Sequence, residues 1–142
     1  MELRVLAVGD VVGASGLKHL EKHLRSVKRL YGVDFCVVNG ENASGVGLTP
    51  QQADAMLDAG ADVITLGNHT WNRREICPYL DDSAYILRPA NFQPSLPGRG
   101  WPVYISSQVA KDLGIDEIIY HPINHEFSFF NNLTKINAGD NT

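Results

Sequence analysis

Five residues in three short motifs have side chains that could carry out chemistry together. Asp10 follows one glycine, Glu41 and Asn42 follow a second, and Asn68 and His69 follow a third. Carboxylate and amide oxygens are hard ligands, which suit magnesium, manganese or iron better than a thiolate zinc site does. A glutamate could bridge two such ions, and two ions about 3.5–4 Å apart can hold a phosphoryl group and activate a hydroxide. A histidine beside them, not itself a ligand, could protonate the leaving oxygen.

Each motif stands directly after a short apolar segment of the kind that forms a buried strand. The three segments are residues 3–8, 35–38 and 63–66, and we expect them to be parallel strands. Because the carboxyl ends of parallel strands lie along one edge of a sheet, the five polar side chains should converge on one crevice. The glycine before each polar group would let the backbone approach a ligand closely.

Helices are predicted between these strands. Apolar residues recur at three- and four-residue spacing from Leu17 to Leu30, which is typical of an amphipathic helix. A second helix should begin after Thr49, an N-cap residue with a glutamine three positions on, and end at Gly60. A short helix interrupted by a proline is expected within residues 72–80. Strands that alternate with helices predict an α/β fold with a mostly parallel or mixed sheet and flanking helices.

The amino-acid composition changes near the hundredth residue. A fourth strand is expected at residues 85–87, and prolines and glycines then mark an extended loop up to residue 102. Residues 103–105 and 115–120 could be strands, with a short helix from Ser107 to Gly114 between them. We therefore divide the chain into an N-terminal portion, residues 1–101, and a tail, residues 102–142, that packs on the same domain or is partly disordered.

Composition restricts the partners. The 142 residues carry a formal net charge of −4 and no run of Lys or Arg, which argues against a surface for polymeric nucleic acid. A small phosphorylated substrate stays open, because metal ions can supply positive charge locally. No segment approaches the roughly 20 apolar residues of a membrane span. Two cysteines are too few for a disulfide scaffold, so we expect a cytoplasmic protein.

Each motif also has a simpler explanation when it is taken alone. Asp10 could cap the following helix, and Asn68 with His69 could form a turn. Three such motifs at successive strand ends are harder to explain as turns. The segment from Gly9 to Gly16 could be a nucleotide-binding turn, but it lacks the GxGxxG pattern.

Four longer motifs resemble the YmdB-like branch of the calcineurin-like metallophosphoesterases. The resemblance covers residues 3–101, and the Glu-Asn pair in the second motif separates this branch from the wider superfamily, which usually has Asp there. The motifs are Gly9-Asp10-Val11-Val12-Gly13, Asn39-Gly40-Glu41-Asn42-Ala43, Gly67-Asn68-His69-Thr70-Trp71 and Arg88-Pro89-Ala90-Asn91-Phe92.

The resemblance implies the N-terminal portion of an α/β/β/α sandwich and a phosphodiesterase that hydrolyses 2′,3′-cyclic nucleotides. It implies two divalent or mixed-valence metal ions, iron or manganese. By motif position, Asp10 would bind the first ion, Glu41 would bridge both, Asn42 would join the first and Asn68 the second. His69 would be the proton donor.

Other residues near these motifs could support the site or the substrate. Arg88 and Asn91 belong to the fourth motif, and we expect them to be structural or to support the site. One of Arg73 and Arg74 could contact a substrate phosphate; adjacent side chains point in different directions, so at most one would.

Family members are longer than this chain, and their second half supplies further histidine ligands in His-Ala-Glu and Gly-His-Thr-His contexts. Neither motif occurs here. His121 and His125 could replace them, but their surroundings do not match and Pro122 argues against a helix that would place both on one face. We expect impaired activity, as in a truncated gene product. The alternative is a catalytically inactive fragment that acts at most as a folding or interaction module, and apolar surface left uncovered would favour a homo-oligomer.

Overall fold

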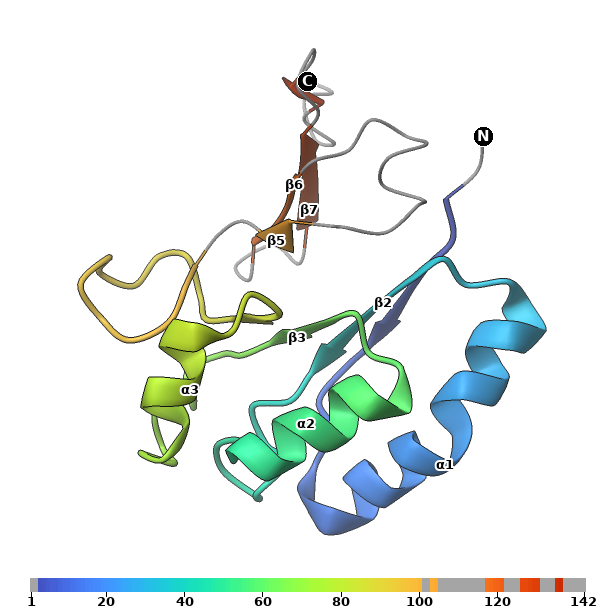
Figure 1. Cartoon of the computed structure of the whole chain (residues 1–142), viewed down its shortest axis with the longest axis horizontal. Helices are drawn as coiled ribbons and strands as arrows, with labels where there is room; N and C mark the ends of the chain where they lie inside the picture. Colours follow the sequence, from blue (N-terminus) through green and yellow to red (C-terminus); the bar gives the residue numbers. More distant parts are fainter. Residues whose placement is uncertain (1–2, 101–102, 105–116, 122–125, 131–134, 137–142) are drawn as a thin grey trace.

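The computed structural model describes residues 3–100, 103–104, 117–121, 126–130 and 135–136, and its strands form two four-stranded sheets (Figure 1). The first sheet is parallel, with the order β1-β2-β3-β4. Its strands are β1 (Val5–Val8), β2 (Phe35–Asn39), β3 (Val63–Thr65) and β4 (Ile86–Leu87). The prediction of an α/β fold with a parallel sheet is confirmed.

Three helices cover one face of this sheet. They are α1 (Gly13–Tyr31), α2 (Pro50–Ala59) and α3 (Ile76–Asp82). Right-handed crossovers between strands in sequential order put every helix on the same side, and Figure 1 shows α1 and α2 together on one side. Buried residues from all three helices accordingly pack against the sheet in a single core, with Leu24, Met56 and Leu80 among them.

Strand β1 differs from the prediction of a buried strand. Val5 and Ala7 are exposed, whereas Leu6 and Val8 are half-buried against the core. Only alternate side chains of β1 therefore pack against the core, whereas β4, at the other edge of the sheet, has both Ile86 and Leu87 buried. Strand β2 lies between two neighbours, and Phe35, Cys36, Val37 and Val38 are all buried.

The helix ends follow local rules. Thr49 and Gln52 form a reciprocal capping box at the start of α2, and Gly60 ends the helix at φ 114°. Both ends agree with the prediction. Helix α1 begins at Gly13, four residues before the predicted start. Pro78 does not interrupt α3, because it lies in the first turn, where a proline needs no hydrogen-bond donor.

The second sheet is antiparallel, with the order β5-β6-β7-β8. Its strands are β5 (Val103–Tyr104), β6 (Glu117–His121), β7 (Glu126–Phe130) and β8 (Lys135–Ile136). The first two agree with predicted strands, and the last two were not predicted. The helix predicted from Ser107 to Gly114 lies outside the described residues. In Figure 1, β6 and β7 lie on the side of the first sheet away from α1 and α2.

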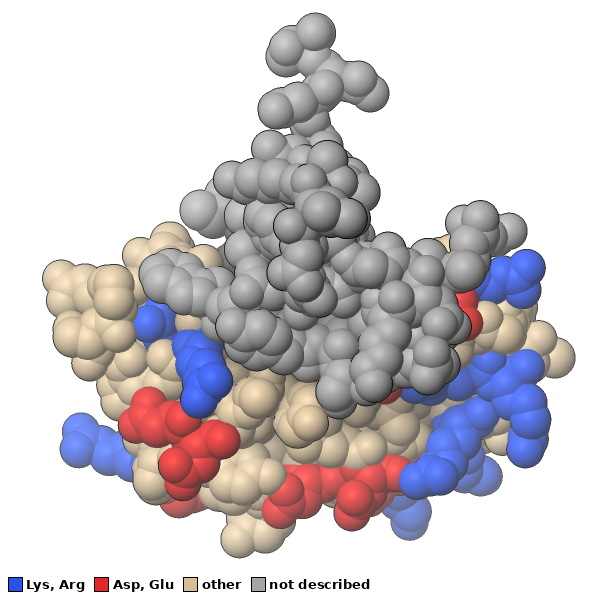
Figure 2. Space-filling model, turned by 45° about the horizontal axis from the view of Figure 1, so that its top comes forward, with Lys and Arg blue, Asp and Glu red and all other residues tan. Residues whose placement is uncertain are grey.

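Charged side chains lie mainly on the outside. Figure 2 shows Lys and Arg at the right and at the left of the view, with Asp and Glu gathered along the lower part between them. Among the described residues, no helix is long and apolar enough to cross a membrane.

Candidate active site

Four of the five predicted site residues meet at the carboxyl edge of the first sheet. The Asn42 side-chain amide donates from Nδ2 to Asp10 Oδ1 at 2.7 Å. Its oxygen, Oδ1, lies 2.7 Å from His69 Nδ1. The backbone N–H of His69 donates to Glu41 Oε2 at 3.2 Å. Residues that follow three different strands therefore form one connected network, as the strand-end argument predicted.

Backbone hydrogen bonds join the loops that follow neighbouring strands of the sheet. Val11 donates to the carbonyl of Asn39 at 3.0 Å, and Gly13 donates to the carbonyl of Asn42 at 2.9 Å. Gly40 likewise donates to the carbonyl of Thr65 at 3.0 Å. The loops after neighbouring strands are thus fixed to one another, and the site side chains do not depend on flexible connections.

Asp10 has an unusual backbone conformation. Its φ of 38° makes it the only residue other than glycine with positive φ among the described residues. Such strain costs on the order of 1–3 kcal/mol and is found preferentially at functional sites. The hydrogen bond from Asn42 holds the exposed Asp10 carboxylate in this position.

Glu41 is packed tightly against the third motif. A Cβ atom added to Gly67 would lie 2.3 Å from Glu41 Oε1 and 2.4 Å from Oε2. Only glycine therefore lets this carboxylate reach its position. The expectation that these glycines let the backbone approach a ligand stays a prediction. A Cβ on Gly9 would meet no protein atom within 4 Å, and one on Gly40 would lie 3.0 Å from Met56 Sδ in the core.

Asn68 does not join the network. It is exposed, and within the described part of the chain its side chain makes no hydrogen bond. His69, by contrast, is about one third exposed, with Nδ1 3.7 Å from Glu41 Oε2. The histidine is anchored and the neighbouring asparagine is free to turn toward a ligand.

The donor set fits a hard metal ion in kind. Asp10, Glu41 and Asn42 offer oxygen ligands close together, and the Asn42 oxygen keeps a second lone pair beside its contact with His69. At the end of β2, Asn39 Oδ1 is buried without a hydrogen-bond partner in the described residues. The set is small, since these residues contain no group of three or more His, Cys, Asp or Glu arranged to hold an ion.

Two polar residues that the sequence did not assign to the site support it. Ser44 Oγ donates to Gln52 Oε1 at 2.6 Å, and Gln52 Nε2 donates to the Ala43 carbonyl at 2.9 Å. The capping glutamine of α2 therefore also holds the loop that follows Glu41 and Asn42. Its position in a capping box was visible in the sequence, but its contact with this loop was not.

Arg88 was expected either to be structural or to support the site, and its contacts are structural. It is 5% exposed and donates only to backbone carbonyls among the described residues. Nε bonds to Gly98, Nη1 to Pro89 and Phe92, and Nη2 to Gln93, at 3.0–3.4 Å. The side chain thereby fixes the loop after β4. Asn91 lies in this loop and is exposed.

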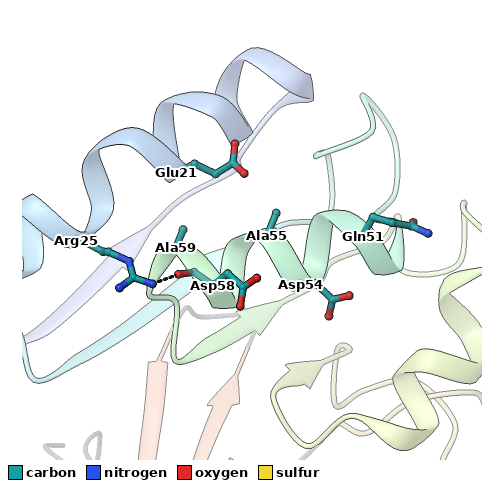
Figure 3. Close-up of a pocket in the computed structure, with 7 residues that line it drawn as sticks. All are labelled: Glu21, Arg25, Gln51, Asp54, Ala55, Asp58 and Ala59. Carbon is teal, nitrogen blue, oxygen red and sulfur yellow. Dashed lines mark hydrogen bonds between the residues drawn. The ribbon is translucent and has the colours of Figure 1, made fainter.

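A groove elsewhere on the surface lies between α1 and α2 (Figure 3). None of the five site residues lines it. Arg25 of α1 crosses the groove and donates to the carbonyl of Asp58 in α2. The lining residues are Glu21, Arg25, Gln51, Asp54, Ala55, Asp58 and Ala59.

Known proteins are similar to most of this chain. It is 42% identical over 99 residues to a 2′,3′-cyclic-nucleotide 2′-phosphodiesterase of Bacillus subtilis (strain 168), covering 69% of this chain and 38% of that protein. A crystal structure of a hypothetical protein from Thermus thermophilus superposes with TM-score 0.65 and 35% identity, over 73% of this chain and 41% of that one. A novel phosphatase from Mycoplasma pneumoniae gives TM-score 0.65 and 26% identity, over 73% and 39%. The chain thus spans less than half the length of each.

The family match extends further than the motifs do. The resemblance rested on residues 3–101, whereas the family model described as YmdB-like protein matches residues 6–137. The match therefore includes most of the tail, in which no family motif had been recognised. The chain belongs to the YmdB-like protein family.

Proposed function

We propose that this chain carries the N-terminal part of a metal-dependent phosphodiesterase site that acts on small phosphodiesters, with 2′,3′-cyclic nucleotides as the substrate class. The observation that supports this most is the network that joins Asp10, Asn42, His69 and Glu41 at one sheet edge. The Bacillus subtilis relative is named for the same chemistry. A net charge of −4 suits a small substrate better than a polyanion.

Asp10, Glu41, Asn42 and Asn68 would hold two divalent or mixed-valence ions, with iron or manganese as the ions expected. Glu41 would bridge the two, Asp10 and Asn42 would belong to the first, and Asn68 would belong to the second. When bound, the ions would supply Lewis acidity and an activated hydroxide. The exposed Asn68 would have to turn toward its ion, whereas the other three already lie together.

His69 would donate a proton to the leaving oxygen. An amide oxygen only accepts hydrogen bonds, so the contact between Asn42 Oδ1 and His69 Nδ1 places a proton on Nδ1. In the imidazolium form, Nε2 then carries the second proton and is the nitrogen that can deliver it. Asn42 fixes the orientation of the ring, and Asp10 fixes the orientation of the Asn42 amide.

A catalytically inactive folding or interaction module is the second candidate. One observation favours it: Asn68 stands apart from the other four residues, and the described residues assemble no group of three His, Cys, Asp or Glu ligands. A site with so few ligands would bind its ions weakly, because each absent ligand lowers affinity. In this case the family motifs would persist without turnover, and the chain could form homo-oligomers through apolar surface.

Hydrolysis assays distinguish the two. The whole chain would be tested with added Mn²⁺ on a chromogenic phosphodiester and on 2′,3′-cyclic AMP, beside Asn68→Ala, His69→Ala and a chelated control. We expect metal-dependent hydrolysis that falls at least about tenfold in both variants. No hydrolysis above the chelated control, in protein shown to be folded by circular dichroism, would refute the enzyme and favour the module.

A further inference from the structure

Arg73 fastens the loop after Glu41 and Asn42 to the turn that carries His69. Its guanidinium donates from Nε to the carbonyl of Val46 at 3.2 Å and from Nη2 to the carbonyl of Ser44 at 3.1 Å. Two of its three nitrogens are thus used on backbone that lies 27 and 29 residues away in the sequence. Arg73 is one of the two arginines that could contact a substrate phosphate, and most of its hydrogen-bonding capacity on these two nitrogens is directed at backbone instead.

The loop that Arg73 holds has a conformation suited only to glycine at two positions. Gly45 has φ 82° and Gly47 has φ 87°. A Cβ on Gly47 would lie 2.8 Å from Arg73 Cγ and 3.0 Å from the Arg73 backbone nitrogen. The aliphatic part of the Arg73 side chain therefore lies directly against the loop backbone. Its guanidinium donates hydrogen bonds to the carbonyls of the two residues that flank Gly45.

The same loop is bonded to the site residues themselves. Gly47 donates to the carbonyl of Glu41 at 2.6 Å, and Gly45 donates to the carbonyl of Asn42 at 2.8 Å. On the other side, Asn72 donates to the carbonyl of His69 at 3.2 Å, one residue before Arg73. One side chain thus links the backbone that carries two oxygen ligands with the backbone that carries the histidine.

We propose that Arg73 is a positioning residue that does not contact substrate. It holds the loop backbone that follows Glu41 and Asn42 in a fixed position relative to the turn that carries His69. Its effect on metal binding rests on the proposed function, but its effect on the loop does not. Lysine should not replace it, because a single ammonium on a flexible stem does not reproduce the planar fork that reaches two carbonyls. The claim predicts a local change in the loop with little change in global stability, since Arg73 is on the surface.

Hydrogen exchange of backbone amides and Mn²⁺ titration by calorimetry test this on Arg73→Ala and Arg73→Lys. Arg74→Ala is the matched control, because Arg74 is an adjacent exposed arginine. Without metal, we expect the Gly45 and Gly47 amides to exchange at least about tenfold faster in both Arg73 variants, with core amides unchanged. With metal and no substrate, we expect Mn²⁺ affinity to fall about tenfold. The control should match the wild type in both measurements.

Each outcome has a definite meaning. Unchanged exchange at Gly45 and Gly47 in Arg73→Ala overturns the proposal, and so does faster exchange that is uniform over the whole protein, which would show general destabilisation. Full restoration by Arg73→Lys also overturns it, because charge alone would then suffice. If the wild type binds no Mn²⁺, the proposed function fails, while the exchange measurement still decides the role of Arg73.

Discussion

Replacing Gly67 with alanine should separate metal binding from folding. The new Cβ would be 2.3–2.5 Å from three atoms of the Glu41 carboxyl group, whereas ordinary contacts begin at 3.4 Å. The carboxylate must therefore move by about 1 Å, and its hydrogen bond from the His69 backbone N–H must break or lengthen. A displacement of about 1 Å at a reacting centre can cost on the order of 10²-fold in rate.

The folding cost should be small. The displaced group is the end of a flexible side chain, and Gly67 does not have positive φ, so alanine fits its backbone. Replacing glycine at such a position reduces the entropy of the unfolded chain and can stabilise by about 0.4–1 kcal/mol, which offsets part of the strain. We expect a change of no more than about 1 kcal/mol in the free energy of unfolding.

Mn²⁺ titration, hydrolysis of 2′,3′-cyclic AMP and urea unfolding would be measured on Gly67→Ala and on Gly9→Ala. The control has the same chemical change, but a Cβ at Gly9 meets nothing within 4 Å. We expect at least about tenfold weaker Mn²⁺ binding for Gly67→Ala and no change for the control. Wild-type affinity in a folded Gly67→Ala protein would refute the reasoning that Glu41 is a ligand held in place by this contact.

Three further predictions concern the surrounding fold. Burial raises the pKa of the Cys36 thiol from 9.0 to about 11. The contribution of the neutral thiol to the free energy of unfolding should therefore be fully present below pH 9 and be lost as the pH rises through 11. This loss is on the order of 3 kcal/mol. Cys36→Ala should lack the decline in urea unfolding, and equal pH slopes in the two proteins would contradict the assignment. Arg88→Leu should lower the free energy of unfolding by about 3 kcal/mol, because it leaves several loop carbonyls unsatisfied, while exposed Arg99→Leu should change it little; similar losses in both would argue against the assigned role. Thr49→Ala should cost about 1 kcal/mol through loss of the capping box, and an unchanged urea midpoint would show that the cap is not needed.

Local sequence signals predicted the parts of the fold that depend on local chemistry. The ends of α2 follow from a capping threonine and a terminal glycine, and both lie where the sequence indicated. The first three strands also lie within or close to the predicted segments, because short apolar runs bounded by turn residues are typical of buried strands. The exposure of β1 could not be predicted this way, since it depends on what covers each face of the strand: β4, at the other edge of the sheet, is buried.

The sequence by itself determined which residue types stand at the carboxyl end of each strand, and so predicted that oxygen-bearing side chains and a histidine would share one edge. That conclusion needs only parallel pairing, which the alternation of strands and helices implies. Only the tertiary structure decided which side chains touch. It left Asn68 outside the network, placed the Glu41 carboxylate against Gly67, and turned Arg73 toward the Ser44 and Val46 carbonyls. These contacts depend on loop conformations and on packing between residues far apart in the chain, which no local pattern specifies.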